Sequence, residues 1–226
     1  IIDEMFLLNP KYYKPLCEGI IERGYGDKLR MWAYSRVDTI RRPDILKLVR
    51  EAGIIWLGIG IESGDKDVRL EVSKGKFEDV DINEVVGQVE EAGINVMANY
   101  IFGLPTDTHD SMRKTQDLAI ELATLGWNGY SAMPLPGSQL YKDAIEAGWE
   151  LPSDYEGYSF HAYTTVPVPT DNLTSSEILK FRDEAYLEYH TSEKFLSKVK
   201  TKYGQEAVDN ILKNCEIKLK RKILGD

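Results

Sequence analysis

The feature that most constrains this chain is a joint that occurs twice, in which a helix-like segment ends in a glycine and an apolar run follows. The joint reads Glu-Ala-Gly-Ile at residues 51–54 and again at residues 91–94. Glycine readily adopts the left-handed backbone conformation that ends many helices. A helix that leads through glycine into a buried strand is typical of a repeating strand–helix unit.

Apolar runs alternate with amphipathic segments over the first two thirds of the chain. They cover residues 1–8, 29–34, 54–61, 94–102 and 127–133. Runs with so little polar alternation are typical of strands buried on both faces, which belong to parallel sheets with helical crossovers. We therefore expect about five strand–helix units over residues 1–148.

The positions of polar residues favour one of two architectures that fit this count, an open doubly wound sheet and a (β/α) barrel. Polar clusters follow nearly every predicted strand, and they lie at Asp3-Glu4, Arg36 to Asp38, Glu62 to Gly64, Asn99 and Pro134 to Ser138. A barrel gathers the carboxyl ends of its strands on one rim around one site. We predict an α/β fold: a partial parallel TIM-like (β/α) barrel over residues 1–148, since five units do not close a barrel.

The last third of the chain has a different character. Residues 151–173 are rich in proline, tyrosine and threonine, and a capping box at residues 174–177 then opens a helix. Two further helices are predicted over 192–203 and 205–222. Residues 149–226 are thus expected to form an irregular segment and a helical C-terminal extension, and the basic residues near the end are interpreted as a solvated helix face.

Composition excludes several classes of protein. The net charge of −9 argues against a nucleic-acid partner, and no run approaches the roughly 18 apolar residues of a membrane helix. Two cysteines, Cys17 and Cys215, are too few for a disulfide framework, which together with the lack of a signal peptide predicts a cytoplasmic protein. Three scattered histidines predict no metal site within the chain.

The stretch from Gly58 to Gly64 is the most informative motif. Its glycines at 58 and 60 alternate within a predicted strand, where they indicate a close approach to the backbone. The strand then ends in Glu62, Ser63 and a further glycine, which together offer a carboxylate, a hydroxyl and amide groups. A glycine-rich bend with a capping serine is the alternative, and a dinucleotide-binding loop is disfavoured because its three-glycine spacing is absent.

The ordered set of these motifs resembles the radical S-adenosylmethionine superfamily. The pieces that carry the resemblance are Asp3-Glu4, Arg36 with Asp38, Gly58 to Gly64, Lys74-Gly75, Gly103-Leu104-Pro105 and Pro134 to Tyr141. The resemblance covers residues 1–148. The remaining residues are similar to the C-terminal extension of the branch that carries an N-terminal cobalamin-binding domain.

The resemblance implies a role for each candidate residue in binding S-adenosylmethionine. It assigns the methionine amino group to Asp3 or Glu4, the methionine carboxylate to Lys74, and the ribose to Glu62 and Asn99. A zwitterion needs one acid and one base, and a ribose needs a bidentate acceptor. The other candidates are Ser63 beside the ribose, the backbone of Pro134 and Leu135 beside the adenine, and Arg36.

The chain departs from the family in one respect. The Cys-x3-Cys-x2-Cys motif that holds the cluster is absent from the sequence, and three thiolates are needed to hold a four-iron cluster with one iron open. We expect a fragment cut downstream of these cysteines and inactive by itself. The alternatives are a cluster-less, non-catalytic module that binds the cofactor or a partner, and an ordinary (β/α) barrel lyase.

The resemblance also implies the chemistry and partners of the whole protein. It would bind S-adenosylmethionine, a 4Fe-4S cluster and, in this branch, cobalamin, and it would cleave the cofactor reductively to a 5′-deoxyadenosyl radical or methylate an unactivated carbon. A flavodoxin or ferredoxin would supply electrons, and the substrate would be a small or lipid-like molecule. Since the first barrel strand is missing, the strand that carries Asp3 would have an exposed edge through which the chain could dimerise.

Overall fold

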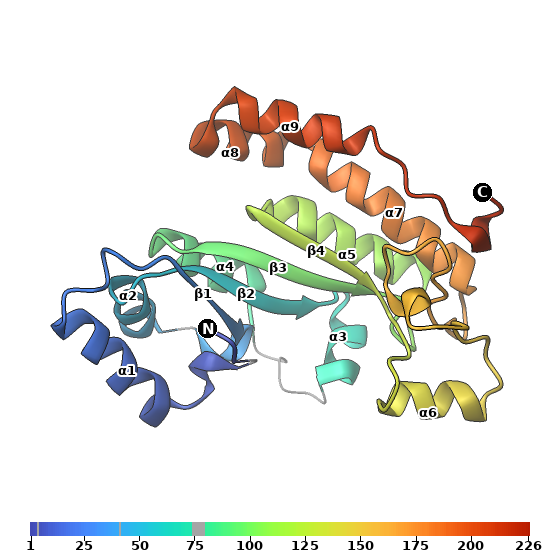
Figure 1. The fold of residues 1–226 in the computed structure, drawn as a ribbon, viewed down its shortest axis with the longest axis horizontal. Helices are drawn as coiled ribbons and strands as arrows, with labels where there is room; N and C mark the ends of the chain where they lie inside the picture. The colour runs from blue at the N-terminus through green and yellow to red at the C-terminus, as the bar shows by residue number, and fades with distance from the viewer. Residues whose placement is uncertain (4, 41, 74–79) are drawn as a thin grey trace. The chain divides into compact units, whose positions relative to one another are not determined.

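The computed structural model describes residues 1–3, 5–40, 42–73 and 80–226, and its central element is a sheet of four parallel strands. These are β1 (Met31–Arg36), β2 (Ile54–Glu62), β3 (Asn95–Phe102) and β4 (Gly126–Ser131). Their order in the sheet is the order in the sequence, as Figure 1 shows. The predicted α/β fold class, a partial (β/α) barrel with a helical C-terminal part, is confirmed.

Helices connect the strands in the predicted manner. Helix α2 (Pro43–Glu51) joins β1 to β2, α3 (Lys66–Ser73) and α4 (Ile82–Glu91) lie between β2 and β3, and α5 (His109–Leu122) joins β3 to β4. A doubly wound sheet reverses its strand order at a switch point, and this sheet does not. The sequential order therefore selects the barrel-like arrangement.

Both glycine joints have the backbone conformation that the sequence predicts. Gly53 and Gly93 have φ angles of +96° and +77°, and each follows a helix and precedes a strand. At Gly53 a side chain would also meet the backbone, because a Cβ atom there would lie 2.7 Å from the carbonyl oxygen of Gly26. Conformation and space both require glycine at this joint.

The strand predicted over residues 1–8 is wrong. The described residues of this segment contain a short 3₁₀ helix, Phe6–Leu8, which is followed by α1 (Pro10–Glu22). Local bonds satisfy the backbone instead of a ladder, since Met5 N donates to the Asp3 carboxylate and Leu8 N to the Met5 carbonyl, both at 3.0 Å. The apolar run instead buries Phe6 and Leu7.

This correction changes the strand count and the edge. Among the described residues the barrel has four strands, and β1 is the first in the sheet order. The free edge predicted for the Asp3 segment therefore belongs to β1 among the described residues. The amino group of Ile1 donates to Trp32 O on this strand at 2.9 Å. Dimerisation through this edge stays a prediction.

The register of β1 and β2 determines which side chains share a face. Trp32 is paired with Trp56, Tyr34 with Gly58 and Arg36 with Gly60. Since side chains alternate along a strand, these residues lie on one face of the two strands. The intervening residues on the other face, Ala33, Ser35, Leu57 and Ile59, are almost fully buried.

The chain divides into two compact units. Unit 1 comprises residues 1–62, 73–99 and 124–128, and unit 2 comprises residues 63–72, 100–123 and 129–226. The carboxyl end of β2 coincides with one boundary, so Glu62 belongs to unit 1 and Ser63 to unit 2. The division at residue 148 predicted from the sequence stays a prediction.

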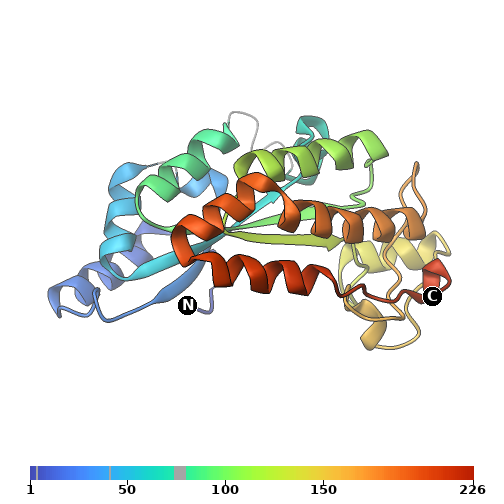
Figure 2. The ribbon, with the colours of Figure 1, turned by 90° about the horizontal axis from the view of Figure 1, so that it is seen from above.

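The C-terminal part is helical, as predicted. It contains α6 (Gln139–Glu146), a 3₁₀ turn at Glu156–Tyr158, α7 (Ser175–Thr191), α8 (Glu193–Tyr203), α9 (Gln205–Cys215) and a 3₁₀ turn at Lys222–Leu224. Helices α7, α8 and α9 pack against one another (Figure 2). The capping box at the start of α7 is present, with Thr174 and Glu177 bonded reciprocally.

The basic end of the chain is less simple than a solvated helix face. Helix α9 ends at Cys215, and Arg221 beyond it is fully buried. Its guanidinium donates to both carboxylate oxygens of Asp183 on α7, at 2.7 and 2.8 Å. The prediction of a solvated face is therefore wrong for Arg221.

Among the described residues, no helix has the length and apolar character needed to cross a membrane.

Candidate cofactor site at the strand ends

Glu62 is the last residue of β2 and has an unusual backbone. Its φ angle of +66° lies in the left-handed region, which non-glycine residues seldom adopt. Strain of this kind is found where the surrounding structure holds a side chain in a required place. The conformation turns the carboxylate back over its own strand, so that a Cβ atom on Gly60 would lie 2.3 Å from Glu62 Oε1.

The environment of the Glu62 carboxylate is poor in partners. Burial raises its pKa above the ordinary value for glutamate. Among the described residues, no hydrogen bond or ion pair to this carboxylate is present. A desolvated carboxylate without a donor is costly, and a ligand that supplies hydroxyl or cationic donors would relieve that cost.

The two glycines of β2 leave space above the strand that the side chains of Tyr34 and Glu62 occupy. Gly58 lies under aromatic rings of β1, because a Cβ atom there would come within 2.7 Å of the Tyr34 ring. Gly60 lies under the Glu62 carboxylate in the same way. The alternating glycines of this strand therefore allow the close approach to the backbone that the sequence indicated.

Asn99 lies on β3 and binds the neighbouring strand. Its side-chain amide donates to the carbonyl of Ile59 on β2 at 3.2 Å and to that of Met97 at 3.3 Å, and its oxygen accepts from Asn128 on β4 at 2.9 Å. The structure therefore places Asn99 in a polar bridge across three strands. A contact with a ribose stays a prediction.

Asn128 was missed by the sequence interpretation. A signal was available, because it is an amide in the middle of an otherwise apolar strand, and such a residue needs partners when it is buried. Its donor completes the hydrogen-bonding of Asn99. The pair positions polar groups on β3 and β4 within unit 1.

Ser63 is used by the fold itself. Its side chain is fully buried, and its hydroxyl bonds with Thr115 Oγ1 at 3.1 Å and accepts from Asp65 N at 3.1 Å. Arg69 also donates to the Ser63 carbonyl at 2.8 Å. In this structure Ser63 builds the turn before α3, and its predicted contact with the ribose stays a prediction.

Arg36 ends β1 and is paired with Asp38. Its Nε atom donates to Asp38 Oδ1 at 2.8 Å, and a second guanidinium nitrogen bonds with Oδ2. The hydrogen bond that Arg36 donates to Asp38 raises the pKa of Arg36. The sequence placed both residues after the same strand, and the structure shows that they neutralise each other.

Of the three candidates for the two ends of the zwitterion, the structure describes Asp3. Asp3 accepts the backbone N–H of Met5, and this bond makes a local turn. Glu4 and Lys74 lie outside the described residues. The predicted acid and base for the methionine group of the cofactor therefore stay predictions.

The loop after β3 is organised by Asp107. This side chain is almost fully buried and accepts from Gly103 N at 3.0 Å, Leu104 N at 2.9 Å and Ser111 Oγ at 2.5 Å. Burial raises its pKa, and the three hydrogen bonds oppose this shift. The Gly-Leu-Pro motif is thus a turn with its own internal acceptor.

Pro134 and Leu135 follow β4 in unit 2 and differ in exposure. Pro134 is buried, whereas the Leu135 side chain is 53% exposed. Leu135 N donates to Met133 O at 2.9 Å, and Leu135 O accepts from Ser138 N at 3.0 Å. This turn presents an apolar side chain beside the end of the strand, and its predicted place against an adenine stays a prediction.

The cysteines do not provide a cluster site within this chain. Cys17 is buried on α1, where burial raises its pKa to about 11, and Cys215 ends α9. A thiol with a raised pKa is a poor source of thiolate, the form that binds iron. In the part of the chain that the structure describes, no group of three histidine, cysteine or acidic side chains could hold a metal ion.

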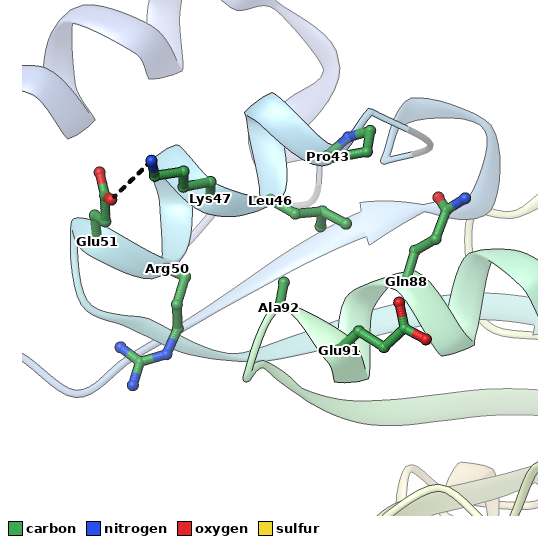
Figure 3. A pocket seen from close by; sticks show the side chains of 8 residues that line it. All are labelled: Pro43, Leu46, Lys47, Arg50, Glu51, Gln88, Glu91 and Ala92. Carbon is green, nitrogen blue, oxygen red and sulfur yellow. Dashed lines mark ion pairs between the residues drawn. The ribbon is translucent and has the colours of Figure 1, made fainter.

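A separate groove of about 430 Å³ lies between the crossover helices α2 and α4. Figure 3 shows its lining, in which Lys47 and Glu51 pair at 3.8 Å. None of the residues predicted to bind the cofactor lines it. The groove is therefore distinct from the strand ends that carry Glu62 and Arg36.

The chain is similar in sequence to parts of two curated enzymes. No family model matches the chain. The anaerobic magnesium-protoporphyrin IX monomethyl ester cyclase of Cereibacter sphaeroides is 27% identical over 183 residues, which cover 79% of this chain and 28% of that protein. The bacteriochlorophyllide d C-12(1)-methyltransferase of Chlorobaculum tepidum is 24% identical over 167 residues, which cover 74% of this chain and 35% of that protein.

Solved structures show a similar fold. The radical S-adenosylmethionine methyltransferase TsrM from Kitasatospora setae, with cobalamin and a 4Fe-4S cluster bound, matches with a TM-score of 0.56 and 22% identity. The match covers 64% of this chain and 29% of that one. The chain spans 28% and 35% of the length of the two curated relatives described above.

Proposed function

We propose that this chain, which belongs to the cobalamin-associated branch of the radical S-adenosylmethionine superfamily, supplies protein contacts to S-adenosylmethionine within a longer enzyme. The observation that carries the proposal is Glu62, a partly buried carboxylate at a strand end, held by a left-handed backbone and without a described partner. A ribose diol offers two hydroxyl donors at adjacent carbons, which suits the two oxygens of one carboxylate. Glu62 thus binds the ribose in our proposal.

The other candidate residues complete the cofactor site in this proposal. Asn99 and Asn128 present polar edges on β3 and β4, and Gly60 keeps open the space into which the carboxylate turns. Glu4 and Lys74 are proposed to hold the amino and carboxylate groups of the methionine moiety. Pro134 and Leu135 are proposed to flank the adenine.

The iron–sulfur cluster does not fit the residues of this chain. Cys17 and Cys215 are single cysteines on different helices, and three thiolates are needed. We therefore assign the cluster to residues outside this sequence. By itself the chain is proposed to bind the cofactor and to be inactive.

The longer enzyme is proposed to act in the manner of its relatives. When the cluster is present, it supplies the electron that cleaves the cofactor, and cobalamin, bound elsewhere in the longer protein, would carry a methyl group. The relatives include a methyltransferase and a cyclase, so we propose radical methylation or ring formation on a small or lipid-like substrate. A flavodoxin or ferredoxin in the cytoplasm is the proposed reductant.

The proposal is tested by asking whether Glu62 recognises the ribose diol. Adenosine and 2′,3′-dideoxyadenosine are titrated into the 226-residue chain and followed by ligand-observed NMR. Adenosine should bind with a Kd on the order of millimolar, where about 4 kcal/mol of affinity remains, and the dideoxy analogue should bind at least tenfold more weakly. In Glu62→Ala the two ligands should bind equally.

The control is Glu18→Ala, which removes an exposed carboxylate on α1. It should keep the full preference for adenosine, with an unchanged circular dichroism spectrum. Equal binding of the two ligands by the parent chain would overturn the assignment of Glu62. A preference that survives in Glu62→Ala would overturn it as well.

A further inference from the structure

Three aromatic rings lie on the same face of β1 and β2 as Glu62. Trp32 and Trp56 are paired in register and stacked, with ring centroids 6.1 Å apart and planes 17° apart. Tyr34 packs against Trp32 with a centroid distance of 5.6 Å. We call these three rings the aromatic face.

A glycine lets these rings lie close to the strand. Gly58 is the register partner of Tyr34, and a Cβ atom there would lie 2.7 Å from two carbons of the Tyr34 ring and 3.3 Å from Trp32. Any other residue would push the rings outward. One side of the Tyr34 ring is therefore covered by the strand.

The other side of the aromatic face is open. Tyr34 is 43% exposed, and Trp32 and Trp56 are half-buried. On the opposite face of the same strands, Ala33, Leu57 and Ile59 are fully buried. The largest side chains of β1 and β2, the three aromatic rings, thus lie on the less covered face, which is the arrangement of a binding surface rather than of a core.

The aromatic face adjoins the proposed ribose site. Gly58 under Tyr34 and Gly60 under Glu62 are two residues apart on β2, which is about 6.6 Å along a strand. A molecule that rests on Tyr34 would therefore lie beside whatever Glu62 holds. The adjacent position suits a substrate whose reacting atom must approach the cofactor.

The chemistry of the aromatic face indicates the class of substrate. Tyr34 lies close over a glycine and leaves part of its ring exposed, and flat conjugated systems stack on exposed rings with modest demands on hydrogen bonding. A saturated, puckered ring system would contact the same rings only through its edges. A planar ligand therefore makes use of a feature that the glycine creates.

We propose that the open face of Tyr34, backed by Trp32 and seated over Gly58, is the stacking surface for a planar conjugated substrate. This inference rests on the proposed function, because it places the substrate next to the ribose site of that proposal. It goes beyond that proposal by naming a substrate class and the residue that selects it. Tyr34 is the specificity-determining residue.

The test uses protoporphyrin IX as the planar probe and deoxycholate as a puckered apolar probe. Both are titrated into the 226-residue chain, and binding is followed by quenching of tryptophan fluorescence and by the absorption of the porphyrin. Protoporphyrin IX should bind saturably, and deoxycholate should bind at least tenfold more weakly. Tyr34→Ala should raise the Kd for the porphyrin about tenfold, the size found when one stacking partner is removed, and Tyr34→Phe should leave it within about twofold.

Two controls separate stacking from loss of fold and from the ribose site. Tyr25→Ala removes a tyrosine of unit 1 that is 50% exposed, and it should bind the porphyrin as the parent does. Glu62→Ala should abolish the preference for adenosine over its dideoxy analogue while leaving porphyrin binding unchanged. Thermal melting of each variant shows whether it is folded.

The outcomes distinguish this inference from the proposed function. Equal binding of the porphyrin by Tyr34→Ala and the parent, or equal binding of deoxycholate and the porphyrin, would overturn the stacking surface even if adenosine recognition by Glu62 stands. Stacking that is retained in a chain without preference for adenosine would leave the surface in place and overturn the ribose site. Absence of any porphyrin binding overturns the inference outright.

Discussion

Two buried carboxylates, Glu62 at the end of β2 and Asp107 just after β3, have opposite relations to the fold. Asp107 accepts two hydrogen bonds from its own loop and one from Ser111 on α5, whereas Glu62 has no described partner. Burial raises the pKa of both groups. The comparison shows that burial by itself does not identify a site, and that the lack of described donors distinguishes Glu62, the carboxylate that we propose binds a ligand.

The largest expected effect is a loss of folding stability when Asp107 is replaced. Asp107→Ala should lower the free energy of unfolding by about 3 kcal/mol, because the buried N–H groups of Gly103 and Leu104 lose a charged acceptor. Urea denaturation measures this change. Asp107→Asn, which keeps one carbonyl oxygen, should lie between the variant and the parent. A loss below about 1 kcal/mol for Asp107→Ala would mean that Asp107 does not organise the loop.

The next largest effect is a loss of adenosine affinity when Gly60 is replaced. Gly60→Ala would place a Cβ atom 2.3 Å from Glu62 Oε1, and the flexible end of the glutamate must move away. We expect a change of less than about 1 kcal/mol in stability, because only the end of a side chain shifts. Adenosine affinity should fall about tenfold, or about 1.4 kcal/mol, because the acceptor is displaced.

Gly87→Ala is the matched control, since a Cβ atom at this position of α4 has no neighbour within 4 Å. It should bind adenosine as the parent does. If Gly60→Ala also kept full affinity, the position of the Glu62 carboxylate would not matter for binding.

Much of the fold was predictable from the sequence because local sequence patterns determine the elements concerned. The glycine joints, the apolar strands and the capping box of α7 each act within a few residues, and all are present. The segment 1–8 was misread because an apolar run fits a strand and a buried turn equally well. The structure has a local turn there, in which Met5 N donates to the Asp3 carboxylate, and no periodicity reveals such a bond.

The site was predictable in a different way. Glu62 and Arg36 could be placed at strand ends from the sequence, but not the pairing of Arg36 with Asp38 or the internal use of Ser63. The use of Ser63 depends on Thr115, which lies 52 positions away, and the pairing of Arg36 with Asp38 depends on how the two side chains turn after the strand. The rings over Gly58 were also missed, because the register that pairs Tyr34 with this glycine is a tertiary property.

A smaller effect is expected at Ser63. Its replacement tests whether Ser63 stabilises the fold, as Asp107 does, or binds the cofactor, as we propose for Glu62. Ser63→Ala removes the bond to Thr115 and the acceptor for Asp65 N, so the free energy of unfolding should fall by about 1 kcal/mol. Adenosine affinity should stay within about twofold of the parent. A loss of affinity larger than the loss of stability would move Ser63 into the cofactor site.

The smallest expected effect is the pH dependence that Glu62 imposes on stability. Because burial raises the pKa of Glu62, the folded chain holds this proton more tightly than the unfolded chain. The unfolding free energy contributed by Glu62 therefore falls as the pH rises from the ordinary glutamate pKa through the raised value. Glu62→Gln carries no such proton, so its stability relative to the parent should increase across this window and level off above it.

Urea denaturation of both chains between pH 4 and pH 8 measures the difference, with Glu18→Gln as the matched control on α1. The control shows how much of the difference comes from replacing an exposed glutamate. Saturating adenosine should reduce this increase in the stability of Glu62→Gln relative to the parent. Hydroxyl donors favour the ionised carboxylate of the parent. A flat difference for Glu62→Gln would mean that Glu62 already has a partner, and the contrast with Asp107 would then no longer hold.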